Sequence, residues 1–159
     1  MSTQTRTDDT TGAARAGTVE FKLEVVVLPV ADVERAKRFY GGLGWRLDAD
    51  FSAGDDFWVV QMTPPGSACS VHFGKGVTTS APGACKNVYL VVSDIEAARA
   101  ELLGRGVDVS QTFHYDGARK RVPGPDPEGR SYSSFAAFGD PDGNTWLLQE
   151  IKTRLPGRV

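Results

Sequence analysis

The sequence predicts an α+β protein built from two βαβββ modules, and three observations support this prediction. The stretch VADVERA at 30–36 recurs 62 residues later as VSDIEAA at 92–98. At the same offset, Gly44 is repeated as Gly106. Each copy follows a run of β-branched apolar residues and opens a helical pattern, which makes a strand-to-helix unit that occurs twice. Two such units can face one another across a shared cleft.

The first module is expected to run from a strand through a helix to three further strands. The first strand covers 22–29, Asp32 is the helix N-cap, and the helix over 33–40 ends in the glycine-rich stretch 41–44. The remaining strands are expected over 45–51, 57–63 and 68–73, where turn residues separate apolar runs.

The second module repeats this order after a linker over 75–85 that is rich in Gly, Thr, Ser and Pro. A strand is expected over 87–92, Asp94 caps a helix over 95–103, and further strands cover 107–112, 133–138 and 145–151. The turn glycines Gly66 and Gly143 are 77 residues apart, so this module carries about 15 extra residues, within 114–130. An insertion of this length predicts a lid, a binding loop or a mobile segment.

Composition and charge narrow the classes of partner. One domain is expected over 20–152, made of module 1 (20–74) and module 2 (86–152), with a disordered N-terminal tail over 1–19 and a C-terminal tail over 153–159. The net charge of −2 favours neither nucleic acid nor an anionic membrane, and no apolar run reaches the roughly 18–20 residues of a membrane span. Cys69 and Cys85 fit reduced thiols, so a cytoplasmic location is expected.

The motifs at the beginning and end of this domain resemble a known family. The first is Pro29-Val30-Ala31-Asp32 followed by Ala36, Phe39, Tyr40 and Gly44-Trp45, and the last runs from Phe138 through DPDGN at 140–144 to Glu150. Together they resemble the vicinal oxygen chelate superfamily of glyoxalases, bleomycin-resistance proteins and extradiol dioxygenases, over about residues 21–151. The resemblance implies two βαβββ modules that form an incomplete barrel around a shared cleft, and it allows a homodimer.

The resemblance also implies where metal ligands would lie. In the metal-using members, ligands come from the first and last strand of each module, and the matching positions here are Val25, Ser70, Asn87 and Leu147. Val25 and Leu147 carry no ligand atom, and Asn87 and Ser70 are poor ligands compared with His, Glu or Asp. A protein without a metal is therefore expected. The alternative is a divalent Zn, Ni, Fe or Mn ion, with Glu24 and Glu150 as ligands if the strand register differs by one residue.

Candidate site residues lie on the strand faces that would line the cleft. His72 is the candidate catalytic acid or base, although a strand histidine satisfied by a neighbour is an equally good interpretation. Period-2 alternation gives His72 and Gln149 matching places in the two modules. The expected ligand-binding residues are Asn87, Tyr89, Gln149, Ser70, Trp58, Arg130 and Tyr132. The run Arg119-Lys120-Arg121 either attracts an anionic ligand or is simply a solvated surface, and the second interpretation is favoured.

Two functions from different classes follow from these residues. The first is a protein of the bleomycin-resistance type that binds a small aromatic or amphipathic molecule in the cleft between the modules without the usual metal. The second is a glyoxalase-like lyase, isomerase or dioxygenase that uses a divalent metal, or His72 as acid and base. The first is the predicted function, and the second is the alternative.

Overall fold

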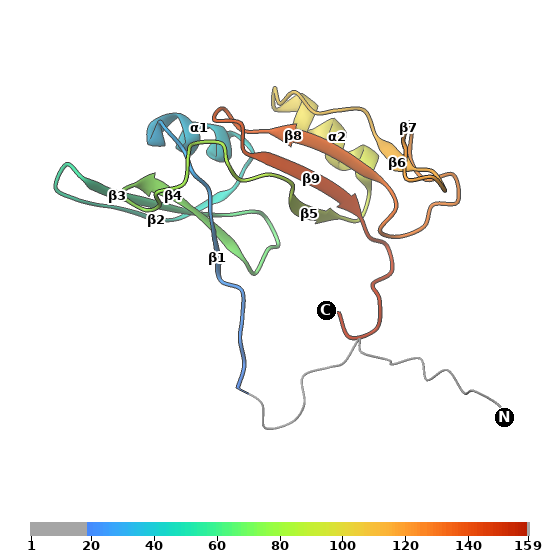
Figure 1. Cartoon of the computed structure of the whole chain (residues 1–159), viewed down its shortest axis with the longest axis horizontal. Coiled ribbons are helices and arrows are strands. Elements are labelled where there is room, and N and C mark those ends of the chain that lie inside the picture. Colours follow the sequence, from blue (N-terminus) through green and yellow to red (C-terminus); the bar gives the residue numbers. More distant parts are fainter. Residues whose placement is uncertain (1–18, 159) are drawn as a thin grey trace.

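The computed structural model of the chain describes residues 19–158. Within this range the chain forms two separate sheets, each covered on one side by a helix (Figure 1). The α+β class and the two modules are confirmed, and among the described residues the two sheets do not close into a barrel. The predicted tail over 1–19 lies outside the described residues, except for the exposed Val19.

Module 1 follows the predicted order of elements. It consists of β1 (Val25–Val27), α1 (Val33–Gly42), β2 (Arg46–Ala53), β3 (Phe57–Thr63) and β4 (Ser70–Lys75). The strands lie in the order β1-β4-β3-β2, with β1 parallel to β4 and the other pairs antiparallel. Because α1 packs on β3 and β4, one side of this sheet is covered and the other is open.

Module 2 has the same plan with an added hairpin. Its elements are β5 (Val88–Val92), α2 (Ile95–Gly104), β6 (Phe113–Tyr115), β7 (Arg121–Pro123), β8 (Phe135–Gly139) and β9 (Thr145–Glu150). The strands lie in the order β5-β9-β8-β6-β7, with β5 parallel to β9. The β6–β7 hairpin occupies part of the insertion that was predicted as a loop, and it extends the edge of the sheet (Figure 1).

The strand predicted over 107–112 is wrong, and Ser110 gives the physical reason. The Ser110 N–H donates to the Ala137 carbonyl at 2.8 Å, but the Ala137 N–H donates to the Ser110 side-chain oxygen at 2.9 Å instead of to the backbone. The ladder therefore ends after one bridge, between Val109 and Phe138. The strand that pairs with β8 at this edge begins only at Phe113.

The repeated motif forms the same local structure in both modules. A side-chain oxygen of Asp32 accepts the Arg35 N–H, and one of Asp94 accepts the Ala97 N–H, each at 3.0 Å. Both predicted N-caps are thus confirmed. Beyond each helix, Gly44 and Gly106 have φ of +81°, a conformation that favours glycine.

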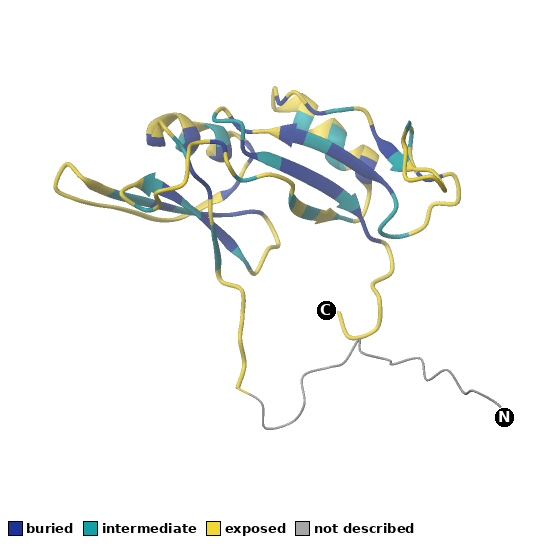
Figure 2. Cartoon of the chain, in the orientation of Figure 1, coloured by how far each residue is buried: buried dark blue, intermediate teal, exposed yellow. Residues whose placement is uncertain are grey.

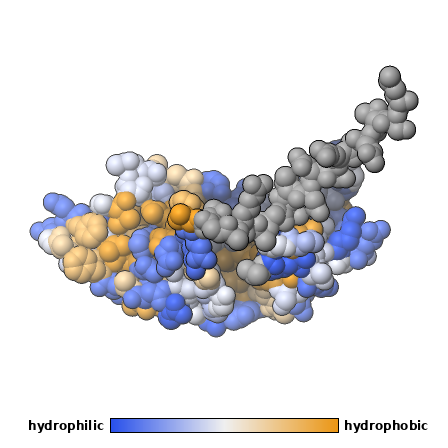
Figure 3. Space-filling model, turned by 90° about the horizontal axis from the view of Figure 1, so that it is seen from below, coloured by the Kyte–Doolittle hydropathy of each residue, from blue (hydrophilic) through white to orange (hydrophobic). Residues whose placement is uncertain are grey.

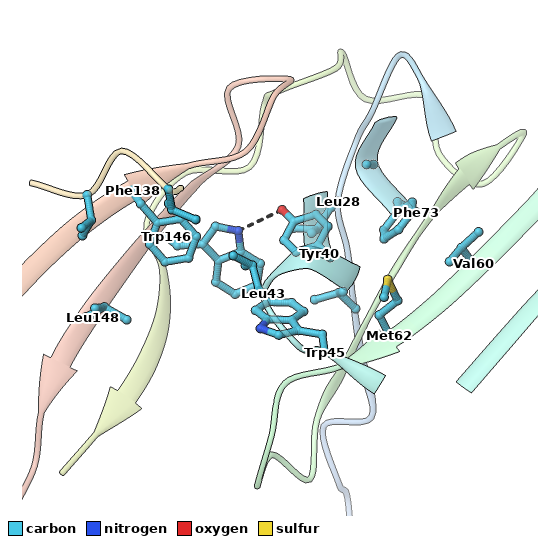
Figure 4. Close-up of a cluster of buried hydrophobic side chains, with 14 of the residues drawn as sticks. Leu28, Tyr40, Leu43, Trp45, Val60, Met62, Phe73, Phe138, Trp146 and Leu148 are labelled. Atoms are coloured by element: carbon cyan, nitrogen blue, oxygen red, sulfur yellow. Dashed lines mark hydrogen bonds between the residues drawn. The ribbon is translucent and has the colours of Figure 1, made fainter. Parts of the chain in front are cut away.

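One hydrophobic core joins the helix-covered sides of both sheets (Figure 2). At its centre, Trp146 of β9 lies edge-on to Trp45 with ring centroids 5.1 Å apart, and Tyr40 of α1 lies 4.8 Å from Trp45. The Trp146 Nε1–H donates to the Tyr40 hydroxyl at 3.0 Å (Figure 4), and that hydroxyl donates to Asp140 at 2.7 Å. The aromatic residues of module 1 therefore pack directly on those of module 2.

The turn over 140–144 also fastens module 2 to the beginning of α1. A side-chain oxygen of Asp142 accepts the Ala31 N–H and a bond from the Arg35 guanidinium, both at 2.9 Å. The side-chain amide of Asn144 donates to the Pro29 carbonyl at 2.8 Å. These contacts join residues more than 100 positions apart in the sequence, so they fix how the two sheets are placed relative to one another.

Candidate functional site

The sides of the two sheets that face away from the helices are open and carry exposed apolar residues. On module 1, Phe51 is 57% exposed and its ring lies edge-on to that of Phe57, with centroids 6.3 Å apart. On module 2, Tyr89 is 54% exposed and Val91 is 44% exposed. Figure 3 looks toward this side, and apolar residues gather over the four-stranded sheet. These faces are accessible to a ligand, as is a pocket of about 200 Å³ on the helix-covered side that Trp45, Leu90 and Leu148 help to line.

A pocket of about 430 Å³ lies on the open face of the five-stranded sheet. Its aromatic lining comes from Tyr89, Tyr115, Tyr132 and Phe135, and Gln149 contributes an amide. The Tyr115 and Phe135 rings lie edge-on to one another, with centroids 5.6 Å apart. Small-molecule sites of this size typically combine flat apolar walls with a few polar groups.

An ion pair holds one wall of this pocket. Asp126 is 5% exposed, and its carboxylate accepts bonds from the Arg130 guanidinium at 2.8 and 3.1 Å and from the Arg130 N–H at 2.9 Å. These bonds, the side-chain bonds first, lower the pKa of Asp126 to about 2. The Asp126 N–H in turn donates to the Ser134 hydroxyl at 2.8 Å. These bonds hold the segment between β7 and β8 in place, because Asp126 contacts both Arg130 and Ser134 within it.

Four of the predicted ligand-binding residues meet at the pocket. They are Tyr89, Gln149, Arg130 and Tyr132. The Gln149 amide donates to the Tyr132 carbonyl at 3.2 Å, and the Tyr132 N–H donates to the Glu150 carbonyl at 2.8 Å. Tyr132 has φ of +70°, so the chain turns sharply where the insertion rejoins the sheet. That turn brings residues from the insertion and from β9 to the same cavity.

His72 and Ser70 lie on the other sheet. The His72 Nε2 atom is 2.7 Å from the Gln61 Oε1 atom, and the histidine is half-buried on the open face of module 1. The buried Ser70 hydroxyl lies 2.7 Å from the Thr63 hydroxyl. The predicted site residues are therefore divided between two sheets, and neither His72 nor Ser70 lines the aromatic pocket.

The predicted equivalence of His72 and Gln149 is wrong. His72 pairs with Val27 of β1, whereas Tyr89 of β5 pairs with Leu147. Val27 and Tyr89 are themselves 62 residues apart, the period of the repeat. His72 therefore corresponds to Leu147, and its place in module 2 is apolar.

Trp58 and Asn87 do not meet the other predicted residues. Trp58 and Gln61 lie three residues apart on β3, so their side chains point to opposite sides of the sheet. The Trp58 indole lies on the helix-covered side, where its N–H donates to Asp50 at 2.6 Å. Asn87 is exposed and precedes β5, with φ of +55° and its N–H donating to the Thr145 hydroxyl at 2.8 Å. Trp58 is therefore a structural residue here, and Asn87 belongs to the entry into the sheet.

The two acidic residues considered as metal ligands have other environments. Glu24 is exposed at the start of β1, where its carbonyl accepts the Ser70 N–H at 2.8 Å. Glu150 is buried, and its carboxylate accepts the Ile95 N–H at 2.8 Å at the beginning of α2. A carboxylate stabilises the positive end of a helix, so the role of Glu150 is to hold α2.

The four positions that the resemblance assigned to metal ligands do not fit a divalent metal. Val25 lies opposite Ser70, and neither Val25 nor Leu147 has a ligand atom. If Leu147 is kept and the strand register is used instead, the set becomes Val27, His72, Tyr89 and Leu147, and His72 is its single good ligand. Between residues 19 and 158, no group of three or more His, Cys, Asp or Glu side chains converges as a metal would need.

Sequence reasoning missed several residues of the pocket, which come from the insertion, from β8 and from the segment just before β8. They are Tyr115, Asp116, Asp126, Ser133 and Phe135, while Arg119 was interpreted as solvated surface. The apolar alternation of Phe113, Tyr115 and the facing Phe135 was the available signal. This alternation was overlooked because residues 114–130 were interpreted as one irregular loop.

Comparison with known proteins places the chain among related folds. A family model described as Glyoxalase/Bleomycin resistance protein/Dioxygenase superfamily matches residues 22–148. A structure described as TnmS3, an antibiotic binding protein from Streptomyces sp. CB03234, is 29% identical with a TM-score of 0.64, covering 84% of this chain and 98% of that one. A glyoxalase/bleomycin resistance protein from the same organism is 30% identical with a TM-score of 0.61, covering 81% of this chain and 100% of that one.

A third structure is a member of the Glyoxalase/bleomycin resistance protein/dioxygenase superfamily from Sphaerobacter thermophilus DSM 20745. It is 25% identical with a TM-score of 0.62, covering 82% of this chain and 98% of that one. The comparison with curated proteins found no match. In the described part of the chain, neither length nor apolarity allows any helix to cross a membrane.

Proposed function

Because the chain belongs to the Glyoxalase/Bleomycin resistance protein/Dioxygenase superfamily, we propose that it binds a small aromatic or amphipathic molecule without a metal. The observation that carries this proposal is the pocket on the open face of module 2, which four aromatic side chains and six polar or charged side chains line. Flat rings provide large contact area, and the amides and carboxylates beside them fix the orientation of a ligand.

The similar proteins support binding of small molecules as the activity. This chain is 29% identical to the Streptomyces protein that is described as antibiotic binding, and the match covers 98% of that protein. The superfamily scaffold hosts unrelated activities, so the residues of the pocket must decide the function. Here those residues provide contact surface and hydrogen bonds, while the set of metal-ligand positions is chemically unsuited to a divalent ion.

A homodimer is part of this proposal. Phe51, Phe57, Tyr89 and Val91 leave apolar surface exposed on the open sides of both sheets. A second copy of the chain would cover these faces and convert each open sheet into one wall of an enclosed cavity. The cavity would then exclude water from the ligand more completely than the open face of one chain.

The test uses the neutral fluorescent probe N-phenyl-1-naphthylamine with the full chain. We expect saturable binding that is unchanged by EDTA, and recovery of the probe unaltered. Tyr89→Ala should weaken binding about tenfold, since each 1.4 kcal/mol is a factor of ten and a ligand ring stacked on the Tyr89 ring gains about that much. Leu103→Ala is the matched control, because Leu103 is 46% exposed on α2, away from the pocket. Sedimentation of the same samples gives the mass of the binding species.

Other outcomes would overturn this proposal. Binding that is lost with EDTA and restored by Zn or Ni would show that a metal is required. Probe binding that Tyr89→Ala and Leu103→Ala affect equally would place the ligand elsewhere. Conversion of a glyoxalase-type substrate that is lost in His72→Ala would establish the catalytic alternative instead.

A further inference from the structure

Two arginines of the β6–β7 hairpin lie over neighbouring aromatic rings. The Arg119 guanidinium carbon is 5.6 Å from the centroid of the Tyr115 ring, and that of Arg121 is 3.5 Å from the centroid of the Phe113 ring. The Tyr115 and Phe113 centroids are 5.9 Å apart. Stacking of this kind holds a guanidinium by its flat face and limits its motion.

The hydrogen-bonding edges of these two guanidinium groups are unused within residues 19–158. The Arg130 guanidinium donates to the Asp126 carboxylate, and the Arg99 guanidinium donates to the Ser110 carbonyl. By contrast, Arg119 and Arg121 make no side-chain hydrogen bond and no ion pair in the described chain. A stacked guanidinium with free N–H groups matches the geometry of a planar oxyanion.

The acidic side chains around the hairpin compensate this positive potential only in part. Asp116 is the acidic residue of the hairpin turn, and its carboxylate accepts the backbone N–H groups of Ala118 and Lys120, each at 2.9 Å. Asp126, the other carboxylate at the pocket, is neutralised by Arg130. Arg130 also lies 3.3 Å from Glu128, so the cationic residues at 119–121 and Arg130 outnumber Asp116, Asp126 and Glu128 by one.

The position of the hairpin connects this charge to the ligand pocket. Arg119 lines the pocket together with Tyr115, and Arg121 is the cross-strand partner of Tyr115. The pocket thus has aromatic walls on the sheet and a guanidinium at the hairpin end. An aromatic ligand lying against Tyr89 or Phe135 would share the pocket with this guanidinium.

We propose that the pocket of module 2 selects aromatic carboxylates, with Arg119 binding the carboxylate and Arg121 adding positive potential beside it. This inference rests on the proposed function, because it names the class of ligand for the same pocket. Within the run 119–121, the two stacked arginines have a role in binding, and the exposed Lys120 between them has none.

Isothermal titration of the full chain with 2-naphthoate and with 2-naphthamide tests the proposal, because the two probes share the same rings and differ in charge. We expect 2-naphthoate to bind about tenfold more tightly at low salt, and the preference to shrink as NaCl is raised. Arg119→Gln should reduce the ratio of the two affinities to about one, and Arg121→Gln should reduce it about threefold. Lys120→Gln removes the same charge from the same turn and should leave the ratio within about twofold of its original value.

Two results would overturn the inference and leave the proposed function intact. One is equal affinity for the two probes in the unmodified chain while N-phenyl-1-naphthylamine still binds. The other is an equal loss of preference in Lys120→Gln and Arg119→Gln, which would reduce the effect to net charge. If neither naphthalene probe nor N-phenyl-1-naphthylamine binds, both proposals fail.

Discussion

The helix-covered sides of the two sheets form one shared core, whereas their open sides carry different residues. On the covered sides, Trp45 of module 1 meets Trp146 of module 2, and the capping residues Asp32 and Asp94 have the same role in each module. On the open sides, module 1 presents His72 bonded to Gln61, and module 2 presents an aromatic pocket beneath an added hairpin. The duplicated motif therefore describes the scaffold, and function depends on the residues that the two copies do not share.

The largest expected effect comes from breaking the shared core. Trp146→Ala removes a fully buried ring that contacts both modules, and it should lower the free energy of unfolding by about 3–5 kcal/mol. Urea denaturation followed by circular dichroism measures this loss, with the half-buried Trp58→Ala as the milder control. A smaller loss for Trp146→Ala than for Trp58→Ala would contradict the placement of the core between the modules.

An intermediate effect is expected from removing one hydroxyl between the modules. Burial and the nearby Asp140 carboxylate raise the pKa of Tyr40 far above its ordinary value, so the hydroxyl remains a donor throughout the accessible pH range. Tyr40→Phe leaves the Trp146 N–H without its acceptor and Asp140 without one donor, which should cost about 1–3 kcal/mol. Equilibrium unfolding of the variant measures this cost. A loss that varied between pH 5 and 8 would contradict a permanently protonated Tyr40.

The smallest expected effect concerns the open side alone. The pKa of Asp126 is lowered to about 2, so the ionised carboxylate stabilises the folded protein above its ordinary pKa of 3.8. That contribution is lost as the pH falls from about 4 toward 2. Asp126→Asn should lower Tm by on the order of a few degrees at pH 7, and the difference from the unmodified chain should shrink in acid. A Tm difference that stayed constant down to pH 2 would show that the ion pair contributes nothing.

The local features of the fold could be predicted from the sequence, because short-range interactions determine them. The N-cap aspartates and the positive-φ glycines after each helix could be predicted from the repeat itself. The strand register could not, because pairing between distant segments sets it. Gly66 lies four residues before β4 and Gly143 lies two residues before β9, so aligning the turn glycines shifted the strands by two residues.

The functional site was harder to predict than the fold for a related reason. Tyr89, Gln149, Arg130 and Tyr132 were identified because they lie on or beside predicted strands. Their partners in the insertion were not, because whether Tyr115 belongs to a loop or a strand depends on its pairing with Arg121. His72 attracted attention as a rare residue type, although its neighbours give it a hydrogen bond rather than a pocket.

The contacts that fasten the turn over 140–144 to α1 also have a consequence for synthesis on the ribosome. The beginning of α1 depends on Asp142, and the Pro29 carbonyl depends on Asn144, which are 111 and 115 residues away. Module 1 emerges first, but it lacks these partners and the core side chains of module 2 until β9 has left the exit tunnel. Native packing of the amino-terminal half is therefore a late event, and the nascent chain presents a substantial apolar surface to chaperones until then.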